Sequence, residues 1–521
     1  MSSSIFDDLI ILDMANNHQG DLTHGLKIIQ DHGKIVKKNN VKAALKFQFR
    51  DLPDFVHSSA RNSKSNKHIN RFLSTQISWE DFLLMQQECV KSGLLTICTP
   101  FDEPSVDRIV EMKFDYIKVA SCSANDWPLL EKIALSELPI VISTGGLSQS
   151  DVDALVSFFS HKGCLFSLMH CVSIYPTPDQ ECNISNISKF SERYPALNIG
   201  WSTHESPQDE IHVGLALASG ATMFERHVGI PFKNQPLNAY SSTPDQIDKW
   251  LLSLKRSKVL LGSKDRKYAS KEEIIAINDL KRGVYAIKDI NKNDSLNDRN
   301  VKYFFPCIEG QLSAGEFLSN SKSKISIKSG NPIMIDSIEV KIDKAKELEL
   351  KLKHAIHEVK AMLAESKITL GSLFQTEYSH HYGIDNFREV GAVLITVVNR
   401  SYAKKILIQL PNQKHPLHLH RLKEETFIVL SGSIDFWLEG KHYNLQPGEQ
   451  LTVPPGTWHE FYSEEGCIVE EISSTAHKGD SVYKDDQINS LSSNQRKTKV
   501  DNWGRFQIIE QLKNNLNIPI I

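Results

Sequence analysis

Two lysines lie inside runs of otherwise apolar residues in the first quarter of the chain, and their chemistry needs an explanation. Lys46 is part of AALKFQF and Lys118 is part of YIKVAS. A buried ammonium group is costly in free energy unless an anion lies beside it. The pattern therefore predicts either a site for an anionic ligand or two structural salt bridges, and the size of that cost favours the anion site.

Further polar side chains stand at the carboxyl ends of similar apolar runs. In chain order these polar residues, the two lysines included, are Asp13, Asn17, His18, Lys46, Gln48, Thr99, Asp102, Lys118, Ser121, Ser143, Thr144, His170, Ser173, Ser202, His204, Glu225 and His227. One such residue per run would be ordinary, because the ends of strands are often polar. The repetition from run to run predicts that these side chains share one site.

Eight apolar runs carry these side chains, and segments with apolar residues at helical spacing separate the runs. The runs are residues 9–15, 41–49, 94–100, 116–121, 139–145, 165–171, 197–204 and 222–228. Strand followed by helix, repeated eight times, is typical of a (β/α)₈ barrel of the α/β class, whose chemistry sits at the carboxyl ends of the strands. A doubly wound sheet is the competing interpretation, but the number of runs and the length of the region favour the barrel.

The rest of the chain divides by composition. We expect the barrel over residues 1–265 and a small strand-rich unit over 278–340, where Asn-Asp and Ser-Gly-Asn turns interrupt short β runs. A charged amphipathic helix over 341–369 is expected to be a solvated connector. Residues 370–476, rich in β-branched and aromatic side chains, predict an all-β barrel or sandwich. Residues 477–521 predict a packed polar tail of unknown role.

Composition limits the classes of function. The 521 residues are 40 % hydrophobic and 24 % charged, which excludes global disorder. Sixty basic and 63 acidic side chains give a formal net charge of −3, so neither nucleic acid nor a membrane is expected as a partner. The eight cysteines contain no CxxC pair, and the first residues lack the basic start of a signal peptide. These features predict a cytoplasmic protein with reduced thiols.

The barrel region resembles the sialic acid synthase family, the phosphoenolpyruvate-dependent condensing enzymes of nonulosonic acid biosynthesis. Eight motifs carry the resemblance, each at an expected strand end: NNHQGDL, ALKFQ, TPFD, IKVAS, ISTGG, HCVSIYPTP, GWSTHE and ERHVG. The resemblance covers residues 10–340, and residues 278–340 look like the antifreeze-like (SAF) domain of that family. It implies a domain-swapped homodimer in which this small unit contributes to the partner subunit's active site.

The resemblance also implies a reaction and roles for residues. The substrates would be phosphoenolpyruvate and an aldose-type sugar, joined to give a 3-deoxy-2-keto sugar acid with release of phosphate. Five residues match positions that bind phosphoenolpyruvate: Lys46, Lys118, Ser121, Ser143 and Ser202. His204 and His227 match the ligands of a divalent metal, manganese or magnesium, and hydrogen-bonded core histidines are the alternative. Asp13 is expected to act in catalysis, and the remaining substrate contacts are expected from Gln48, Ser173 and Tyr175.

Several positions depart from the family pattern, and they cluster on the side of the acceptor sugar. Asp13 and Ser123 stand where members that use N-acetylmannosamine have glutamates, and Ser173 stands where an asparagine contacts phosphoenolpyruvate. Residues 236–244 replace a Pro-Asp-His segment, and residues 301–310 lack the arginine that recognises an N-acetyl group. Loss of such hydrogen bonds changes specificity. We therefore expect a different acceptor sugar, and a phosphorylated acceptor is an alternative.

Residues 370–476 resemble a cupin. His418, His420 and Glu425 fit its first motif and His459 its second, so these four residues imply a site for a divalent transition metal (Zn, Mn, Fe or Ni). Acids or bases beside that metal would come from Glu424, Glu460 or His415. The resemblance leaves two roles open, a sugar isomerase or epimerase and a structural or sensing module. A regulatory protein with a decayed barrel and a cupin sensor is the alternative for the whole chain, but the retained lysines and histidines oppose it.

Overall fold

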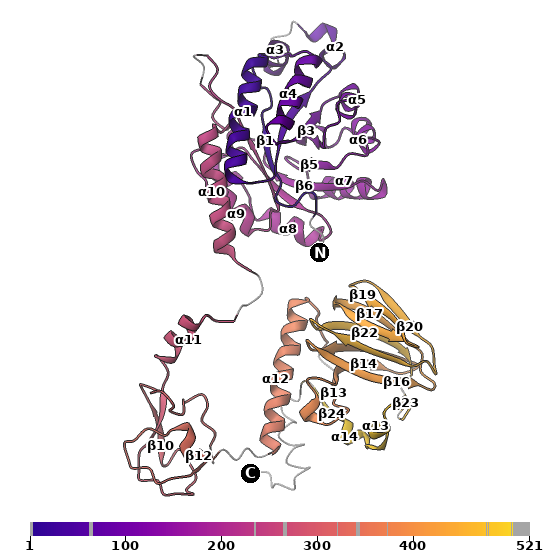
Figure 1. Cartoon of the computed structure of the whole chain (residues 1–521). Coiled ribbons are helices and arrows are strands. Elements are labelled where there is room, and N and C mark those ends of the chain that lie inside the picture. The colour runs from indigo at the N-terminus through magenta and orange to yellow at the C-terminus, as the bar shows by residue number, and fades with distance from the viewer. Residues whose placement is uncertain are drawn as a thin grey trace. The chain divides into compact units, whose positions relative to one another are not determined.

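The computed structural model describes residues 4–61, 66–233, 236–263, 268–319, 321–339, 344–371, 374–475, 477, 479–501 and 503. The chain divides into two compact units, Met1–Tyr268 and Ala269–Ile521 (Figure 1). Among the described residues, no helix combines the length and apolar character needed to cross a membrane.

The first unit is a closed barrel of eight parallel strands, as the alternating pattern predicts. The strands are β1 (Ile10–Asp13), β2 (Ala43–Phe49), β3 (Leu95–Pro100), β4 (Tyr116–Val119), β5 (Ile140–Ser143), β6 (Phe166–Cys171), β7 (Ile199–Thr203) and β8 (Met223–His227). The barrel closes where β1 pairs with β8, and this pairing sets Asp13 beside His227. The competing doubly wound sheet is therefore excluded.

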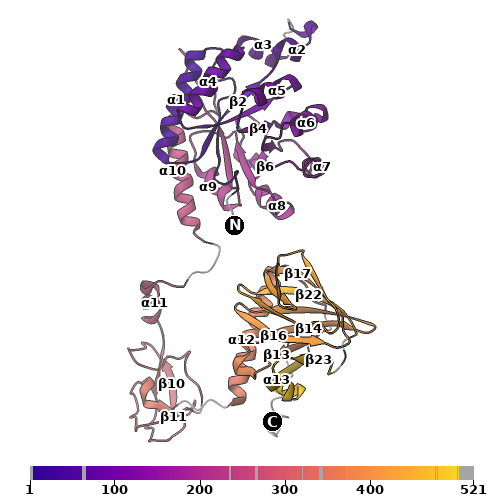
Figure 2. The same cartoon turned by 45° about the vertical axis from the view of Figure 1, so that its right-hand side comes forward.

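Helices surround the strands, as Figure 2 shows. They are α1 (Leu22–Asn39), α2 (Leu52–Phe55), α3 (Lys67–Ser74), α4 (Trp79–Lys91), α5 (Glu103–Glu111), α6 (Trp127–Ala134), α7 (Gln149–His161), α8 (Asn186–Arg193), α9 (Ile211–Ala218) and α10 (Pro244–Leu261). Their apolar faces pack against outward-facing strand residues such as Phe47 and Phe49. The connection from β2 to β3 is the longest, because it carries α2, α3 and α4.

Alternation along the strands places the polar residues inside the barrel. Ile11, Ala44 and Met223 belong to an apolar cluster that fills the barrel interior. Side chains two residues apart in a strand face the same side. Asp13, Lys46 and Glu225 each follow one of these apolar residues by two positions, so they form the next layer toward the carboxyl ends. The apolar layer below seals that layer from the other end of the barrel.

The second unit begins with α11 (Lys271–Asn278) and a small strand-rich region at the expected place. Its strands are β9 (Gly283–Ala286), β10 (Val301–Phe304), β11 (Lys322–Ser323) and β12 (Ile338–Glu339). They form two short antiparallel pairs. A core of its own, which includes Val284, Leu296 and Ile333, holds the region together.

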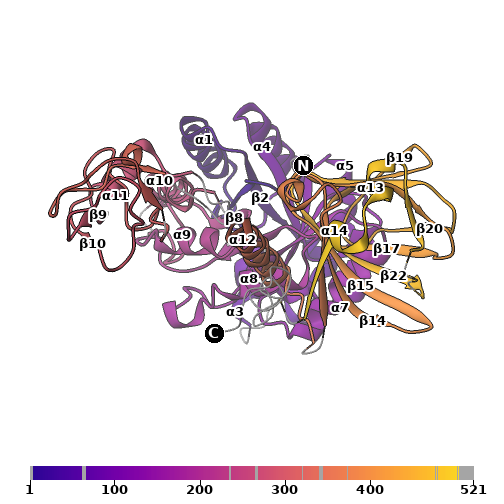
Figure 3. The ribbon, with the colours of Figure 1, turned by 90° about the horizontal axis from the view of Figure 1, so that it is seen from below.

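The module that follows consists of two antiparallel sheets, drawn as orange and yellow arrows in Figure 3. The seven-stranded sheet has the order β20-β17-β22-β15-β14-β13-β24 and the five-stranded sheet the order β19-β18-β21-β16-β23. The strands are β13 (Gln375–Ser379), β14 (Ala392–Asn399), β15 (Tyr402–Gln409), β16 (Gln413–His420), β17 (Glu425–Gly432), β18 (Ile434–Leu438), β19 (Lys441–Leu445), β20 (Gln450–Val453), β21 (His459–Ser463), β22 (Cys467–Ser474), β23 (Ser481–Tyr483) and β24 (Lys497–Asp501). The predicted all-β module is confirmed.

The expectation of a solvated connector is wrong for α12 (Lys344–Glu365). Leu352, Ile356, Val359 and Leu363 are buried in one cluster with residues of the seven-stranded sheet. Their spacing of three or four residues places them on one face of the helix. The many charges of this segment hid that apolar stripe, and the helix is a packed part of the module.

The module also continues past residue 476. β24 pairs antiparallel with β13, and Trp503 packs against the cluster that α12 joins. Two short helices, α13 (Asp486–Ser490) and α14 (Ser493–Arg496), lie between β23 and β24. The expected tail is thus packed, as predicted, but through residue 501 it completes the sheets of the module. Residues 504–521 lie outside the described part of the chain.

Candidate functional site

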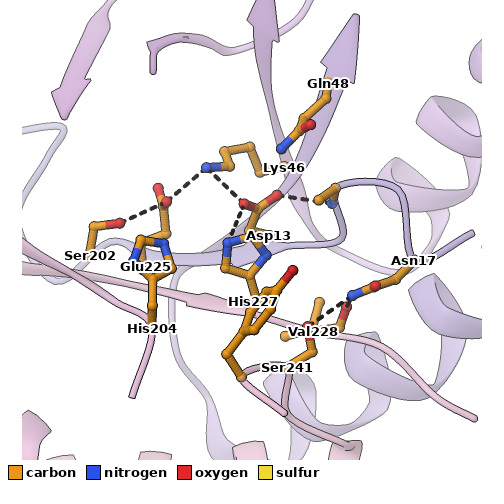
Figure 4. Close-up of polar contacts among 12 residues, drawn as sticks. Asp13, Asn17, Lys46, Gln48, Ser202, His204, Glu225, His227, Val228 and Ser241 are labelled. Atoms are coloured by element: carbon orange, nitrogen blue, oxygen red, sulfur yellow. Dashed lines mark hydrogen bonds and ion pairs between the residues drawn. The ribbon is translucent and has the colours of Figure 1, made fainter. Parts of the chain in front are cut away.

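A buried carboxylate, Glu225 on β8, connects both lysines of the barrel (Figure 4 shows its contacts with Lys46 and Ser202). Its Oε1 lies 2.7 Å from Lys46 Nζ, and its Oε2 lies 2.9 Å from Lys118 Nζ. The Ser202 hydroxyl donates to Oε1 at 3.0 Å. Sequence reasoning noted Glu225 as a polar strand end but gave it no role. An acidic residue inside an apolar strand, two positions before His227, was the available signal.

Asp13 extends this network toward the histidines. Its Oδ2 lies 3.0 Å from Lys46 Nζ and 3.3 Å from His227 Nε2, and its Oδ1 accepts the Ala15 backbone N–H at 2.9 Å. Two ammonium groups and two carboxylates therefore lie together at the carboxyl ends of β1, β2, β4 and β8. Lys46 and Lys118 thus form salt bridges with Asp13 and Glu225, and any anionic ligand would share the lysines with these carboxylates.

Burial and mutual attraction compete in setting the charges of this network. Burial lowers the pKa of Lys46, but the Asp13 and Glu225 carboxylates outweigh burial and hold the pKa above its usual value. Burial keeps the pKa of Lys118 below its usual value, although Glu225 opposes the shift. Burial raises the pKa of Glu225, but the two ammonium groups prevail and hold it well below the usual range. Glu225 is therefore ionised at neutral pH.

His204 and His227 lie side by side above this network, with ring centres 5.2 Å apart. The Nδ1 of His204 lies 2.8 Å from the Val172 carbonyl oxygen, a hydrogen bond that leaves Nε2 as the basic nitrogen. Burial lowers the pKa of His204 to about 3 and also lowers that of His227, so both imidazoles are neutral at physiological pH. Two neutral imidazoles, one of them in contact with the Asp13 carboxylate, are ligand types that suit a divalent cation. Tyr175 packs against His204 with ring centres 4.1 Å apart.

The expected serines gather around Gly145, which follows β5. Ser121 Oγ accepts the Gly145 backbone N–H at 3.0 Å. A β-carbon at Gly145 would lie 2.5 Å from Ser173 Oγ and 2.8 Å from Ser121 Oγ, so only glycine fits between these hydroxyls. Ser143, at the end of β5, is buried. Hydroxyl groups of this kind can donate hydrogen bonds to a phosphate or carboxylate.

The remaining predicted residue, Gln48, lies on β2 two positions beyond Lys46. Its side-chain oxygen accepts a hydrogen bond from Arg50 Nη2 at 3.2 Å. Both side chains line a cavity of about 220 Å³ beside α3 and α4. Sequence reasoning did not single out Arg50, because it stands one residue past the apolar run.

In the second unit, three of the four expected metal ligands converge. One ligand atom each from His418 and His420 on β16 and His459 on β21 lie within 4.8 Å of one another. Glu425 at the start of β17 is close by, with Oε1 3.5 Å from His420 Nε2 and Oε2 3.4 Å from His459 Nε2. Glu425 also pairs with Lys423, which sequence reasoning missed.

The polar atoms of this cluster fit a metal. His459 Nε2 and Glu425 Oε2 are buried and, in the described part of the chain, have no hydrogen-bond partner. A cation between them would satisfy both atoms. Burial lowers the pKa of His459 to about 4 and that of His420 to about 2, so both rings are neutral as metal ligands must be.

Of the three expected neighbours of this cluster, only His415 lies against it. Its ring centre is 4.5 Å from that of His418, and its Nε2 lies 3.1 Å from Nε2 of His381, another buried histidine. Glu424 is exposed and Glu460 alternates with the inward-facing residues of β21. The pair HisHis at 380–381 was the signal for His381, but it stands 34 residues before His415 in the chain.

Comparison with known proteins gives two domain matches. Residues 36–266 match the NeuB family and residues 406–473 match the cupin domain. The crystal structure of a spore coat polysaccharide biosynthesis protein E from Chromobacterium violaceum is 38 % identical, with a TM-score of 0.61 over 64 % of this chain and 100 % of that chain.

Two curated relatives are similar over the first part of the chain. N,N′-diacetyllegionaminic acid synthase of Campylobacter jejuni is 26 % identical over 56 % of this chain and 89 % of its own length. N-acetylneuraminate-9-phosphate synthase of Drosophila melanogaster is 31 % identical over 44 % of this chain. The match spans 62 % of the Drosophila protein, and neither match reaches the whole of this chain.

Proposed function

Through its barrel the chain belongs to the NeuB family of condensing enzymes, and on that premise we propose that it joins phosphoenolpyruvate to the aldehyde of an open-chain sugar. The enol carbon of phosphoenolpyruvate would form the new C–C bond while water adds to its C2. Loss of phosphate by C–O cleavage would then leave the oxygen of that water as the ketone of a nonulosonic-type 3-deoxy-2-keto sugar acid. The observation that carries the proposal is the pair of lysines bridged by Glu225 directly below the His204 and His227 rings. Cations for a phosphate thus lie beside groups suited to an aldehyde oxygen.

Lys46 and Lys118 are proposed to bind the phosphate and carboxylate of phosphoenolpyruvate. Glu225 holds both ammonium groups in place and keeps them charged, so they need no rearrangement when the ligand arrives. Ser121, Ser143, Ser173 and Ser202 would donate hydrogen bonds to the same anion. As phosphate leaves, these fixed donors would stabilise the growing negative charge on its oxygens.

Asp13, His204 and His227 are proposed to hold the divalent metal of the barrel, manganese or magnesium. Such a cation supplies Lewis acidity, which polarises the aldehyde of the acceptor. The Val172 carbonyl fixes the His204 ring, and Asp13 orients His227 while it pairs with Lys46. Gln48 and Tyr175 are positioned to contact the acceptor, since Gln48 lines the cavity and Tyr175 covers His204.

For the cupin module we propose a divalent transition metal (Zn, Mn, Fe or Ni) on His418, His420, His459 and Glu425. Three histidines converge, and His459 Nε2 and Glu425 Oε2 have no hydrogen-bond partner among the described residues, which supports this proposal. An isomerase or epimerase that acts on a related sugar is the role we propose for it. A sensing module would bind the sugar without converting it.

We also propose that residues 278–340 act as an SAF domain in a homodimer and reach the active site of the partner subunit. With a core of only a few residues the unit has little independent stability, which favours packing against another surface. Sedimentation of the full chain at micromolar concentration tests this proposal. A fully active monomer contradicts it.

The test of the main proposal is mass spectrometry of the products formed from phosphoenolpyruvate and a panel of aldoses, with and without manganese. We expect a product that contains the three carbons of pyruvate added to one aldose, together with free phosphate. If phosphoenolpyruvate remains intact with every sugar and metal, the proposed condensation is wrong.

A further inference from the structure

Arg50 is a partly buried cation near the carboxyl end of β2, and it forms no ion pair with the residues that the structure describes. Its guanidinium lies between two aromatic rings, 3.6 Å from the centre of Phe101 and 4.0 Å from the centre of Phe72. Nη2 donates to the neutral side chain of Gln48, and Nε is buried with no partner among the described residues. Burial lowers the pKa of Arg50 to about 10, which leaves it charged at neutral pH.

The other buried cations of this barrel are paired, which sets Arg50 apart. Lys46 and Lys118 contact Glu225, and Arg226 lies 3.4 Å from Glu205. Asp102 lies near enough to raise the pKa of Arg50, but its two carboxylate oxygens accept the backbone N–H groups of Ser105 and Asp51. A charge that is withdrawn from water without an ion pair is costly in free energy, so an anionic ligand would stabilise Arg50.

Arg50 directly follows β2, the strand that carries Lys46 of the reacting centre. In extended chain, side chains two residues apart face the same side, so Arg50 faces the side of Gln48 and Lys46. Four residues of extended chain span roughly 13 Å. Gln48 and Arg50 line the same cavity of about 220 Å³. A sugar whose aldehyde reacts beside Lys46 and whose chain passes Gln48 would extend toward Arg50.

Two carboxylates, Asp51 and Glu80, line the cavity as well. Neither forms an ion pair with Arg50 among the described residues. Carboxylates accept hydrogen bonds from sugar hydroxyls, whereas a guanidinium fork binds phosphate or carboxylate. The lining therefore matches a chain of hydroxyl groups that ends in one acidic group.

We propose that Arg50 selects an acceptor sugar with an anionic group, phosphate or carboxylate, at the end remote from its aldehyde. This inference rests on the condensation proposed above and names the substrate class for it. Phe72 and Phe101 hold the guanidinium plane in place, so the fork is ordered before the sugar binds. Arg50 acts on specificity and is remote from the reacting atoms.

The test compares three acceptors with one carbon chain: mannose, mannose 6-phosphate and mannuronate. N-acetylmannosamine and its 6-phosphate form a second set. Phosphate release is measured at saturating phosphoenolpyruvate for the wild type, Arg50→Gln, Arg50→Lys and the surface variant Arg193→Gln. We expect the wild type to prefer a charged acceptor and Arg50→Gln to lose roughly 10- to 100-fold in kcat/KM for it. Neutral acceptors should be unaffected, and Arg193→Gln should match the wild type.

Each outcome decides one point. A preference for the phosphate or for the carboxylate identifies the acidic group. If Arg50→Gln does not fold, Arg50→Lys keeps the charge and should keep the preference with weaker affinity. A wild-type preference for neutral sugars, an equal loss on neutral and charged acceptors, or a change confined to the KM for phosphoenolpyruvate overturns the inference while the condensation stands. If the wild type fails to release phosphate with every acceptor tested, the proposed function fails and this inference fails with it.

Discussion

Lys118 Nζ lies 2.9 Å from Glu225 Oε2 in the interior of the barrel, where both side chains are almost completely buried. The other oxygen of the same carboxylate holds Lys46. Breaking a buried pair by removal of one partner leaves an uncompensated charge, which is far more costly than loss of a surface ion pair. Glu225 therefore has a structural role that can be separated from any role in the reaction.

We expect Glu225→Gln to lower the free energy of unfolding by roughly 3–5 kcal/mol, because two buried ammonium groups lose their shared counter-charge. Phosphoenolpyruvate should restore part of that loss, since its anionic groups replace the carboxylate. Thermal unfolding with and without phosphoenolpyruvate measures both effects. Glu111→Gln, which alters a surface pair with Arg108, is the control and should change neither. An equal ligand-induced rise in Tm for Glu225→Gln and the wild type would contradict the assignment of the lysines.

Replacing Lys46 or Lys118 with Met should raise the KM for phosphoenolpyruvate by roughly 10- to 100-fold, because each change removes a charge-assisted contact but keeps the aliphatic stem. The KM for the acceptor should change less. Steady-state kinetics with each substrate varied in turn separates the two effects. An unchanged dependence on phosphoenolpyruvate would count against the site.

His204→Ala and His227→Ala should each abolish condensation and weaken manganese binding while the barrel stays folded. Each change removes one of only three proposed ligands, and the remaining set cannot hold the cation in place. Calorimetric titration with Mn²⁺ and circular dichroism test the two halves of this prediction. The exposed His161→Ala is the matched control and should bind the metal like the wild type. Full activity of either site variant in excess EDTA would refute the metal role.

The sequence predicts those parts of the site that depend on contacts within one strand, and it does not predict contacts between distant residues. Alternation within a single strand sufficed to place Lys46 and Gln48 inside the barrel and Lys118 beside them. The pairing of Lys118 with Glu225 joins residues 107 positions apart, and no local pattern identifies such a partner. The same limit hid His381, which follows β13 of one sheet and contacts His415 on β16 of the other sheet.

The predicted boundaries of the cupin module were wrong for a related reason. Charges on α12 suggested a solvated helix, yet the apolar face between Leu352 and Leu363 packs against the seven-stranded sheet. β24 has the sequence KTKVD, with four polar residues and one buried valine, Val500, so its composition gave no sign of a strand. β24 pairs with β13, where Val500 lies opposite Thr376, 124 positions earlier in the chain. This pairing is a property of the fold alone.

Lysines of β24 also make the free energy of unfolding of the module depend on pH. Burial raises the pKa of Glu377, but Lys497 and Lys499 on β24 outweigh it and lower the pKa to about 2. A carboxyl with a depressed folded pKa adds stability above its unfolded value of 4.5, and that stability is lost as the pH falls toward 2. The contribution is about 3 kcal/mol. Glu377→Gln should therefore unfold with less dependence on pH between 5 and 2 than the wild type, as urea denaturation followed by tryptophan fluorescence would measure.

The double variant His418→Ala and His459→Ala tests the independence of the two candidate sites. It removes two of the three convergent histidines, so metal analysis of the purified protein should show loss of the transition metal from the cupin module. Condensation by the barrel should persist, because the barrel and the cupin module have separate apolar cores. Any isomerase or epimerase activity should disappear, since its proposed metal is gone. Phosphate release and sugar interconversion are measured separately on the same preparation, with His442→Ala, an exposed histidine that pairs with Asp435, as the control. Loss of condensation by a double variant whose barrel remains folded would mean that the cupin completes or controls the synthase site.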